Sequence, residues 1–332
     1  MSRALSRFAR RRAVQVSAVL AVVCGLLAWW LFPPGGPAPS GRVTFSTGVP
    51  TGVYQQYGEL LRVALARDLP DVSITLRNSE GSQQNLARLA SGEADFTVAT
   101  ADAVAQYQSD GKPGANRLRG LARLYDDYVQ LIVPKSSKVT SVAGLKGLRV
   151  GVGQEGSGVR LIADRVLTAA GLDAETDIRP VSAGIDTMPG LLQRGELDAF
   201  FWSGGLPTRA VQSLSQRHPV RLVPLEDELI AQLHDNGAST RHYRSAVVPA
   251  DAYPLAQDWQ PVKTLAVTNL LVTTERTDAA MAEGFTRTVI RSRDRIGGQV
   301  HPAQLVDLRT AIYTDPLPLH DGAKRYYQSV KP

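Results

Sequence analysis

The chain has 332 residues, a single cysteine and a formal net charge of +6 at pH 7. Five arginines and no acidic residue stand among its first 40 positions, so the rest of the chain carries a net charge of only +1. This balance gives no support to nucleic-acid binding, and one cysteine excludes a disulfide within the chain. The remaining 290 or so residues exceed what one hydrophobic core usually holds, which favours two lobes.

The first 41 residues are predicted to form three short segments. Residues 1–12 form a basic segment, residues 13–32 an uncharged run, and residues 33–41 a flexible tether rich in Pro, Gly and Ser. About 20 apolar residues suffice to span a bilayer, and an arginine-rich flank stays in the cytoplasm. We therefore expect an N-terminal helix anchored in the inner membrane, with the remainder on the periplasmic side. A long cleaved signal peptide, which would release a periplasmic protein, remains the alternative.

From residue 42 onward, short apolar strands alternate with amphipathic helices, an order that predicts mostly parallel sheets flanked by helices. The expected strands cover residues 43–47, 71–77, 96–99, 148–152 and 198–202, and the clearest helices cover residues 159–170 and 207–216. Two longer apolar stretches, residues 118–133 and 263–274, are expected to cross between the lobes. The first lobe would then comprise residues 42–133 and 264–332, and the second lobe residues 134–263. Two chain segments that cross between the lobes are expected to act as a hinge about which the lobes close.

Four loops at predicted strand ends supply candidate ligand contacts, because ligands of open α/β sheets bind beyond the C-terminal ends of the strands. Their glycines let backbone N–H groups approach a carboxylate or phosphate at a helix N-terminus. Each loop also has a structural interpretation, since hydroxyl residues such as Ser82 and Thr100 commonly cap helices. The candidates in these loops are Thr47, Gly48, Tyr54, Gly81, Ser82, Asn85, Thr100, Ser157, Gly158 and Arg160. Trp202 is added as a candidate from the second lobe.

The fourth loop also fits a dinucleotide-binding pattern. Residues 151–156 read G-x-G-x-x-G between a strand and a helix, and Asp173 and Glu175 follow about 20 residues later. An NAD-dependent oxidoreductase is therefore one alternative. Nicotinamide cofactors are scarce outside the cytoplasm, and an anion-binding helix start explains the same glycines, so we expect no cofactor.

At this point the motifs resemble a known family. The chain is similar to the TAXI family of solute-binding proteins, the receptors of one branch of TRAP transporters, from about residue 43 to residue 327. The matching segments are Thr47-Gly48 with Gly52 and Tyr54, Gly81-Ser82 with Asn85, Gly144 to Gly153, Gly156 to Arg160, Asp198 to Phe201, Gly205-Leu206-Pro207, and Pro318 to Ala323 with Tyr326-Tyr327.

The resemblance implies a two-lobed periplasmic-binding-protein-like fold of type II, without enzymatic activity. It implies that a small anionic or zwitterionic solute, glutamate-like as a first guess, binds between the lobes and is delivered to the membrane subunits of a TRAP transporter. It also adds Gly205 to the ligand-binding candidates. The chain departs from the family at Val53, Gln55, Val159 and Trp202-Ser203, positions where a ligand would lie, so its solute is expected to differ.

The enzyme and sensor classes fit less well. The five histidines are scattered without metal-ligand spacing, so no metal site is expected, and Asp126-Asp127, the clearest carboxylate pair, is predicted to lie in a loop at a strand end. The ligand-sensing ectodomain of a membrane signalling complex remains the second alternative, and such a sensor would have to signal through a partner protein.

The N-terminal run generates a first prediction. Because 20 uncharged residues match the thickness of a bilayer, the protein should fractionate with membranes, and added protease should reach it only from the periplasmic side. Cell fractionation with immunoblotting checks this. A soluble form that begins near residue 40 would show instead that the segment is a cleaved signal.

Overall fold

The computed structural model describes residues 22–23 and 38–330, and one compact unit begins at Pro39. The predicted membrane run at residues 13–32 lies almost wholly outside the described residues. None of the described helices combines the length and the apolar character that crossing a bilayer requires.

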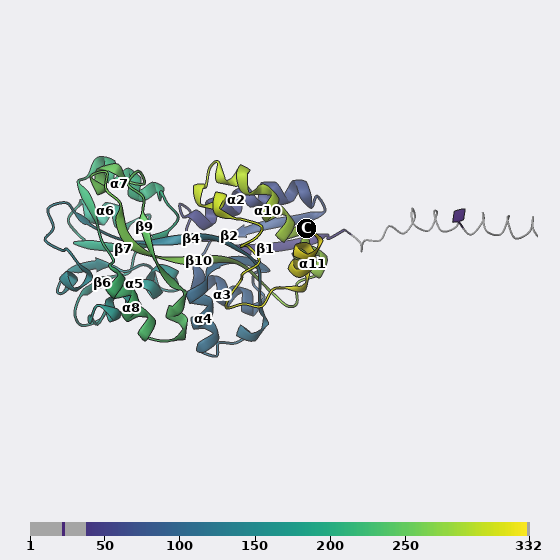
Figure 1. Cartoon of the computed structure of the whole chain (residues 1–332), viewed down its shortest axis with the longest axis horizontal. Helices are drawn as coiled ribbons and strands as arrows, with labels where there is room; N and C mark the ends of the chain where they lie inside the picture. Colours follow the sequence, from purple (N-terminus) through teal and green to yellow (C-terminus); the bar gives the residue numbers. More distant parts are fainter. Residues whose placement is uncertain (1–21, 24–37, 331–332) are drawn as a thin grey trace, which may run out of the picture. The chain divides into compact units, whose positions relative to one another are not determined.

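Within residues 38–330, ten strands form one continuous sheet (Figure 1). The order is β2-β1-β3-β10-β4-β7-β5-β6, with β8 paired to β4 and β9 paired to β10. The strands are β1 (Gly41–Ser46), β2 (Val72–Arg77), β3 (Phe96–Thr100), β4 (Leu118–Pro134), β5 (Arg149–Gly151), β6 (Arg179–Val181), β7 (Ala199–Gly204), β8 (Val220–Val223), β9 (Tyr243–Val248) and β10 (Val262–Thr274). The predicted strands are thus present, with small differences at their ends.

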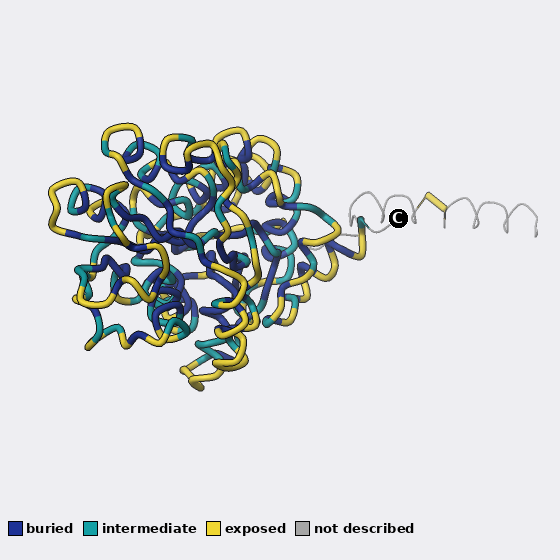
Figure 2. The backbone as a smooth tube through the Cα atoms, turned by 60° about the vertical axis from the view of Figure 1, so that its left-hand side comes forward, coloured by how far each residue is buried: buried dark blue, intermediate teal, exposed yellow. Residues whose placement is uncertain are grey.

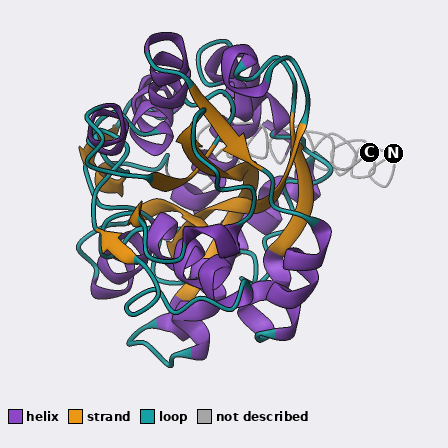
Figure 3. Cartoon of the chain, turned by 90° about the vertical axis from the view of Figure 1, so that its left-hand side faces the viewer, coloured by secondary structure: helices purple, strands orange, loops and turns teal. Residues whose placement is uncertain are grey.

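Helices flank the strands on both sides (Figure 3). They are α2 (Val53–Asp68), α3 (Ser82–Ser91), α4 (Ala101–Ser109), α5 (Gly158–Ala169), α6 (Met188–Gln193), α7 (Arg209–Arg217), α8 (Asp227–Asp235), α9 (Pro254–Gln257), α10 (Ala279–Gly297) and α11 (Asp321–Ser329). Short 3-10 turns occur at Ala115–Arg117, Val142–Leu145, Ala238–His242 and His301–Leu305. The amphipathic pattern explains the packing of α2, because Tyr57, Leu61 and Leu65 lie on its buried face.

The two long strands β4 and β10 join the two ends of the sheet. They pair antiparallel from Ala266 opposite Tyr128 to Thr274 opposite Leu118, with two register shifts between. The outer pairs β1–β2, β1–β3, β5–β6 and β5–β7 are parallel, as the strand–helix alternation predicts. The sheet therefore has parallel ends and an antiparallel middle.

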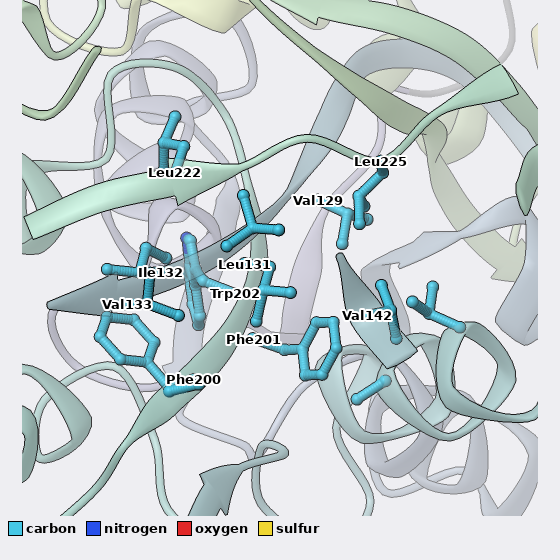
Figure 4. Packing of buried hydrophobic residues seen from close by; sticks show 14 of the residues in the cluster. Val129, Leu131, Ile132, Val133, Val142, Phe200, Phe201, Trp202, Leu222 and Leu225 are labelled. Atoms are coloured by element: carbon cyan, nitrogen blue, oxygen red, sulfur yellow. The ribbon is translucent and has the colours of Figure 1, made fainter. Parts of the chain in front are cut away.

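Buried hydrophobic side chains gather in separate clusters along this sheet. The largest is built from residues 129–267, and Figure 4 shows members from β4, β7 and β8. A second cluster combines residues 43–125 with residues 271–327, and a smaller third cluster lies beside α3 and α4. Figure 2 shows buried residues mainly along the inner segments of the backbone and exposed residues mainly on its outer turns. The separation supports our proposal of a first lobe at residues 42–133 and 264–332 and a second lobe at residues 134–263, with β4 and β10 crossing between them.

Candidate functional site

A cavity lies between loops of the two proposed lobes, and its space amounts to about 610 Å³, part of which is open solvent. One wall comes from the first lobe: Gly48, Val49, Gly52, Val53, Tyr54, Glu80, Gly81, Ser82, Thr100 and Asp127. The other comes from the second lobe: Gly153, Gln154, Ser157, Gly158, Val159, Ala183, Gly184, Met188, Trp202, Ser203 and Gly204. Eight of the twelve predicted site residues are among them.

The N-termini of α3 and α5 meet across this cavity. A Cβ placed on Gly81, which precedes α3, would lie 3.4 Å from the backbone N of Gly158, the first residue of α5. A Cβ on Gly158 would lie 3.2 Å from Ser82 Oγ. Each helix N-terminus carries a partial positive charge, so two of them facing each other create a position that favours an anion.

Glycine is required at this meeting point. Gly81 has φ of +135°, a backbone conformation that residues with a side chain rarely adopt. The first turn of any helix leaves backbone N–H groups without intrahelical acceptors. In the described chain, Gln84 N donates to Gly156 O at 3.0 Å and Arg160 N donates to Ser157 Oγ at 3.0 Å. The first of these bonds joins the start of α3 to the loop before α5, and the second caps α5 itself.

Three hydroxyl residues surround the meeting point. Ser157 is the N-cap of α5, and its side chain accepts the hydrogen bond from Arg160 N. Ser82 Oγ accepts a hydrogen bond from the backbone N of Thr100 at 3.2 Å and so ties the start of α3 to the start of α4. Thr100 caps no N–H with its side chain. All three side chains are buried and line the cavity.

Asp127 is the main site residue that sequence reasoning missed. It was expected with Asp126 in a loop at a strand end, and this prediction is wrong: both residues lie inside β4, paired with Val267 and Thr268 of β10. The side chain of Asp127 is buried and lines the cavity, whereas Asp126 bonds to Arg123, Arg244 and Thr268. A signal was available in the sequence, because two adjacent acids within a long predicted strand are costly to bury unless they are paired or hydrogen-bonded.

Burial raises the pKa values of two neighbouring groups in the cavity wall, Asp127 and Tyr54. Loss of hydration raises the pKa of Asp127 to about 7, and the nearby carboxylates of Asp126 and Asp102 act in the same direction. Tyr54 is also buried, and burial together with the charge of Asp127 holds its pKa well above the usual range. Tyr54 therefore stays a neutral hydroxyl that donates to Asn269 Oδ1.

Two predicted ligand contacts, Asn85 and Thr47, lie outside the cavity lining and bond within the scaffold. Asn85 is fully buried, and its Nδ2 donates to Thr47 O at 2.7 Å and to Val98 O at 3.0 Å. Its Oδ1 accepts from Ser46 Oγ at 2.6 Å, so the amide joins β1, β3 and α3. Thr47 Oγ1 donates to Gln55 Oε1. Neither Asn85 nor Thr47 lines the cavity.

Arg160 and Gly205 also lie outside the cavity wall. The Arg160 guanidinium forms ion pairs with Glu155, Asp164 and Glu175 at 2.8–2.9 Å, which explains why it is not available to a ligand. At Gly205, an added Cβ would lie 2.2 Å from Pro302 Cγ, so this glycine permits close packing of the chain. Of the positions that depart from the TAXI pattern, Val53, Val159, Trp202 and Ser203 line the cavity, and Gln55 does not.

The charged lining is acidic. Asp127 and Glu80 are its ionisable carboxylates, and among the described residues around the cavity there is no Lys, Arg or His. Arg165, on α5, is paired with buried Asp102 at 3.2 Å. Across residues 38–330, no group of three or more His, Cys, Asp or Glu is placed to hold a metal ion. The positive contribution to the cavity therefore comes from backbone amides.

A known protein family matches most of this chain. Residues 45–330 match the NMT1-like family. The chain belongs to the NMT1-like family. The match spans both walls of the cavity and all strands from the end of β1 to β10.

Solved structures show the same fold at low sequence identity. The alkanesulfonate-binding protein SsuA from Xanthomonas axonopodis pv. citri, bound to MOPS, is 18% identical, with a TM-score of 0.50 over 90% of this chain and 86% of that chain. A putative L-cystine ABC transporter from Listeria monocytogenes is 12% identical, with a TM-score of 0.51 over 80% and 98%. This NMT1-like chain therefore has the α/β fold of type II periplasmic binding proteins, as predicted.

The scaffold role of Asn85 generates a prediction. Asn85→Ala should lower the free energy of unfolding by about 2–4 kcal/mol, because it removes three buried hydrogen bonds that are worth about 0.5–1.5 kcal/mol each. Chemical denaturation measures the change, with exposed Asn116→Ala as the control. Unchanged stability together with lost ligand binding would return Asn85 to the site.

The raised pKa of Asp127 generates a prediction about how stability depends on pH. In the unfolded chain this carboxyl loses its proton near pH 4, whereas the fold retains the proton up to about pH 7. Stability is therefore lost as pH rises through this window, by at most about 1.4 kcal/mol per unit. Relative to the wild type, Asp127→Asn should gain about 2–4 kcal/mol between pH 4 and pH 8. Denaturation at both pH values checks this, with Asp126→Asn as the control, and a pH-independent difference would contradict it.

Proposed function

We propose that this protein is an extracytoplasmic solute-binding receptor that holds a small carboxylate-bearing solute in the cavity between its lobes. The observation that carries the proposal is the meeting of the α3 and α5 N-termini, each supplied by a different lobe. A carboxylate there would satisfy amides of both helices at once. Family membership and the likeness of the fold to solute-binding structures support the proposal of a solute-binding receptor.

Closure of the lobes around the solute is part of the proposal. Contacts already cross the cavity mouth: Gln83 Nε2 donates to Ser157 O at 2.8 Å, and Thr51 Oγ1 donates to Asp186. A ligand that contacts both walls binds the closed arrangement better than the open one and so shifts the population toward it. β4 and β10, which cross between the lobes, would act as the hinge.

Delivery to a membrane transporter completes the proposed role. The TAXI-like motifs support a TRAP-type secondary transporter as the recipient, and the predicted N-terminal anchor would keep the receptor near it. We further propose that the protein does no chemistry on its solute. The alternative of a sensor ectodomain would use the same cavity and the same closure, and only the identity of the membrane partner separates the two.

The dinucleotide alternative has weaker support. In the described chain, Gly153 has φ of +86°, and a Cβ there would lie 2.8 Å from Arg160 N, so the loop folds tightly onto the start of α5. The carbonyls of Gly156 and Ser157 bond to the start of α3 across the cavity. A pyrophosphate would have to displace these contacts, whereas a single carboxylate fits beside them.

The position of Gly158 provides the test. Gly158→Ala should weaken binding of carboxylate solutes about 5- to 150-fold, because the added methyl would lie where both helix N-termini meet and remove an anion contact worth about 1–3 kcal/mol. Alanine favours a helix, so the fold should persist. Gly190→Ala in α6, where a Cβ meets only the flexible end of Arg194, is the matched control.

The fluorescence emission of Trp202 can be used to measure solute binding. It is buried in the cavity wall, and its Nε1 donates to Thr208 Oγ1 at 3.0 Å. A Trp259→Phe background removes an indole that is 66% exposed, so that the remaining change in emission on titration reports chiefly on the cavity. A panel of amino acids and organic acids is titrated. Equal affinity of Gly158→Ala and the parent for every member that binds would place the carboxylate elsewhere.

A further inference from the structure

The cavity wall contains a buried carboxylate oxygen without a donor. Asp127 is 4% exposed, and its Oδ1 has no hydrogen-bond partner among the described residues. The antiparallel pairing of β4 with β10 fixes its backbone, so the side chain cannot simply move to solvent. An unpaired buried acceptor is costly, and a ligand that donates to it would remove that cost.

The cations near Asp127 are bound to other acids. Arg123 and Arg244 pair with Asp126, and Arg165 pairs with Asp102, which also accepts from Tyr243 Oη at 2.7 Å. The side chains that share the cavity end with Asp127 are neutral or acidic, as Tyr54 and Glu80 show. The Asn269 amide on β10 and the Tyr54 hydroxyl also lie beside this carboxylate, and both are neutral. A positive charge supplied by the ligand is therefore the charged partner that Asp127 lacks among the described residues.

The distance between Asp127 and the helix starts fits a compact solute. The Tyr54 hydroxyl donates to Asn269 Oδ1, lies 3.3 Å from Ser82 Oγ and is close enough to Asp127 for that carboxylate to add to the effect of burial in raising the pKa of Tyr54. Since this one hydroxyl is near both groups, the start of α3 and the Asp127 carboxylate are separated by on the order of two hydrogen-bond lengths, roughly 6 Å. An ammonium group and a carboxylate attached to the same carbon atom can reach both.

We propose that Asp127 pairs with a protonated amine while the N-termini of α3 and α5 hold the carboxylate, so that the site selects α-amino acids over the corresponding carboxylic acids. This inference rests on the proposed function and adds its specificity-determining residue. A second negative charge on the solute would meet no cation among the described lining residues. The remaining wall includes Val49, Val53, Val159 and Met188, so the preferred side chain is neutral and apolar rather than glutamate-like.

Matched solute pairs test the inference. The purified protein is titrated by calorimetry at pH 7.5 with L-leucine and 4-methylpentanoate, L-valine and 3-methylbutanoate, and L-glutamate and glutarate. We expect at least one apolar amino acid to bind more than about 30-fold tighter than its deamino partner. Asp127→Asn should weaken that amino acid about 10- to 150-fold. Asp126→Asn, on the same strand but outside the cavity lining, should change it less than about 3-fold.

A pH series gives a second readout that does not depend on the variant. Protonation of Asp127 competes with the ammonium group, so wild-type affinity for the amino acid should fall up to about tenfold per unit below pH 7. Glu80, Asp102 and Asp126 remain in Asp127→Asn, so a slope that they cause would persist there. The inference expects the slope to disappear in that variant.

The outcomes separate the two proposals. Equal binding of an amino acid and its deamino partner, or a wild-type affinity that does not depend on pH between 5 and 7.5, overturns the role of Asp127. In that case binding of the acids still supports a carboxylate receptor. Failure of every pair to bind at millimolar concentration overturns the proposed function and, with it, this inference.

Discussion

The cavity depends on one electrostatic constraint: the N-termini of α3 and α5 lie so close that a Cβ added to Gly81 would contact the backbone N of Gly158. Two partial positive charges held this close oppose each other unless something negative lies beside them. The fold accepts the arrangement because Gln84 N and Gln83 Nε2 donate to carbonyls of the opposite loop. A bound carboxylate would strengthen the same contact. Because the two helix N-termini belong to different proposed lobes, binding of the carboxylate and closure of the lobes would occur together.

The acidic end of the cavity complements this constraint. Asp127 sits in a long strand that crosses between the proposed lobes, so its position is set by the ladder between β4 and β10. The neighbouring acids form ion pairs with the nearby arginines: Asp126 pairs with Arg123, and Asp102 pairs with Arg165. The site therefore combines backbone positive charge with side-chain negative charge, without a cationic side chain in the described lining. Such a combination suits a solute whose own charges sum to zero.

The roles of polar residues around the site divide according to what they bond. Asn85 is buried, polar and next to the cavity, yet all its hydrogen-bonding groups are used within the chain. Arg160, with the right charge for a carboxylate ligand, is paired with three acids. Asp127, by contrast, has an oxygen without a hydrogen-bond partner in the described part of the chain. Residue type alone does not distinguish these cases, because a donor already satisfied by the protein has little left to offer a ligand.

The sequence by itself determined the strand–helix order, the two long crossing strands and the glycine–hydroxyl loops, because periodicity and local backbone preferences act over a few neighbouring residues. It also placed eight of the twelve predicted site residues at the cavity, since those loops follow strand ends. The tertiary structure alone decided which side chains remain unpaired. Asp126 and Asp127 are adjacent and chemically identical, yet β9, which pairs with β10, brings Arg244 to Asp126, whereas Asp127 lines the cavity. The two aspartates differ because their partners lie far away in the chain, and a local sequence pattern cannot predict such long-range contacts.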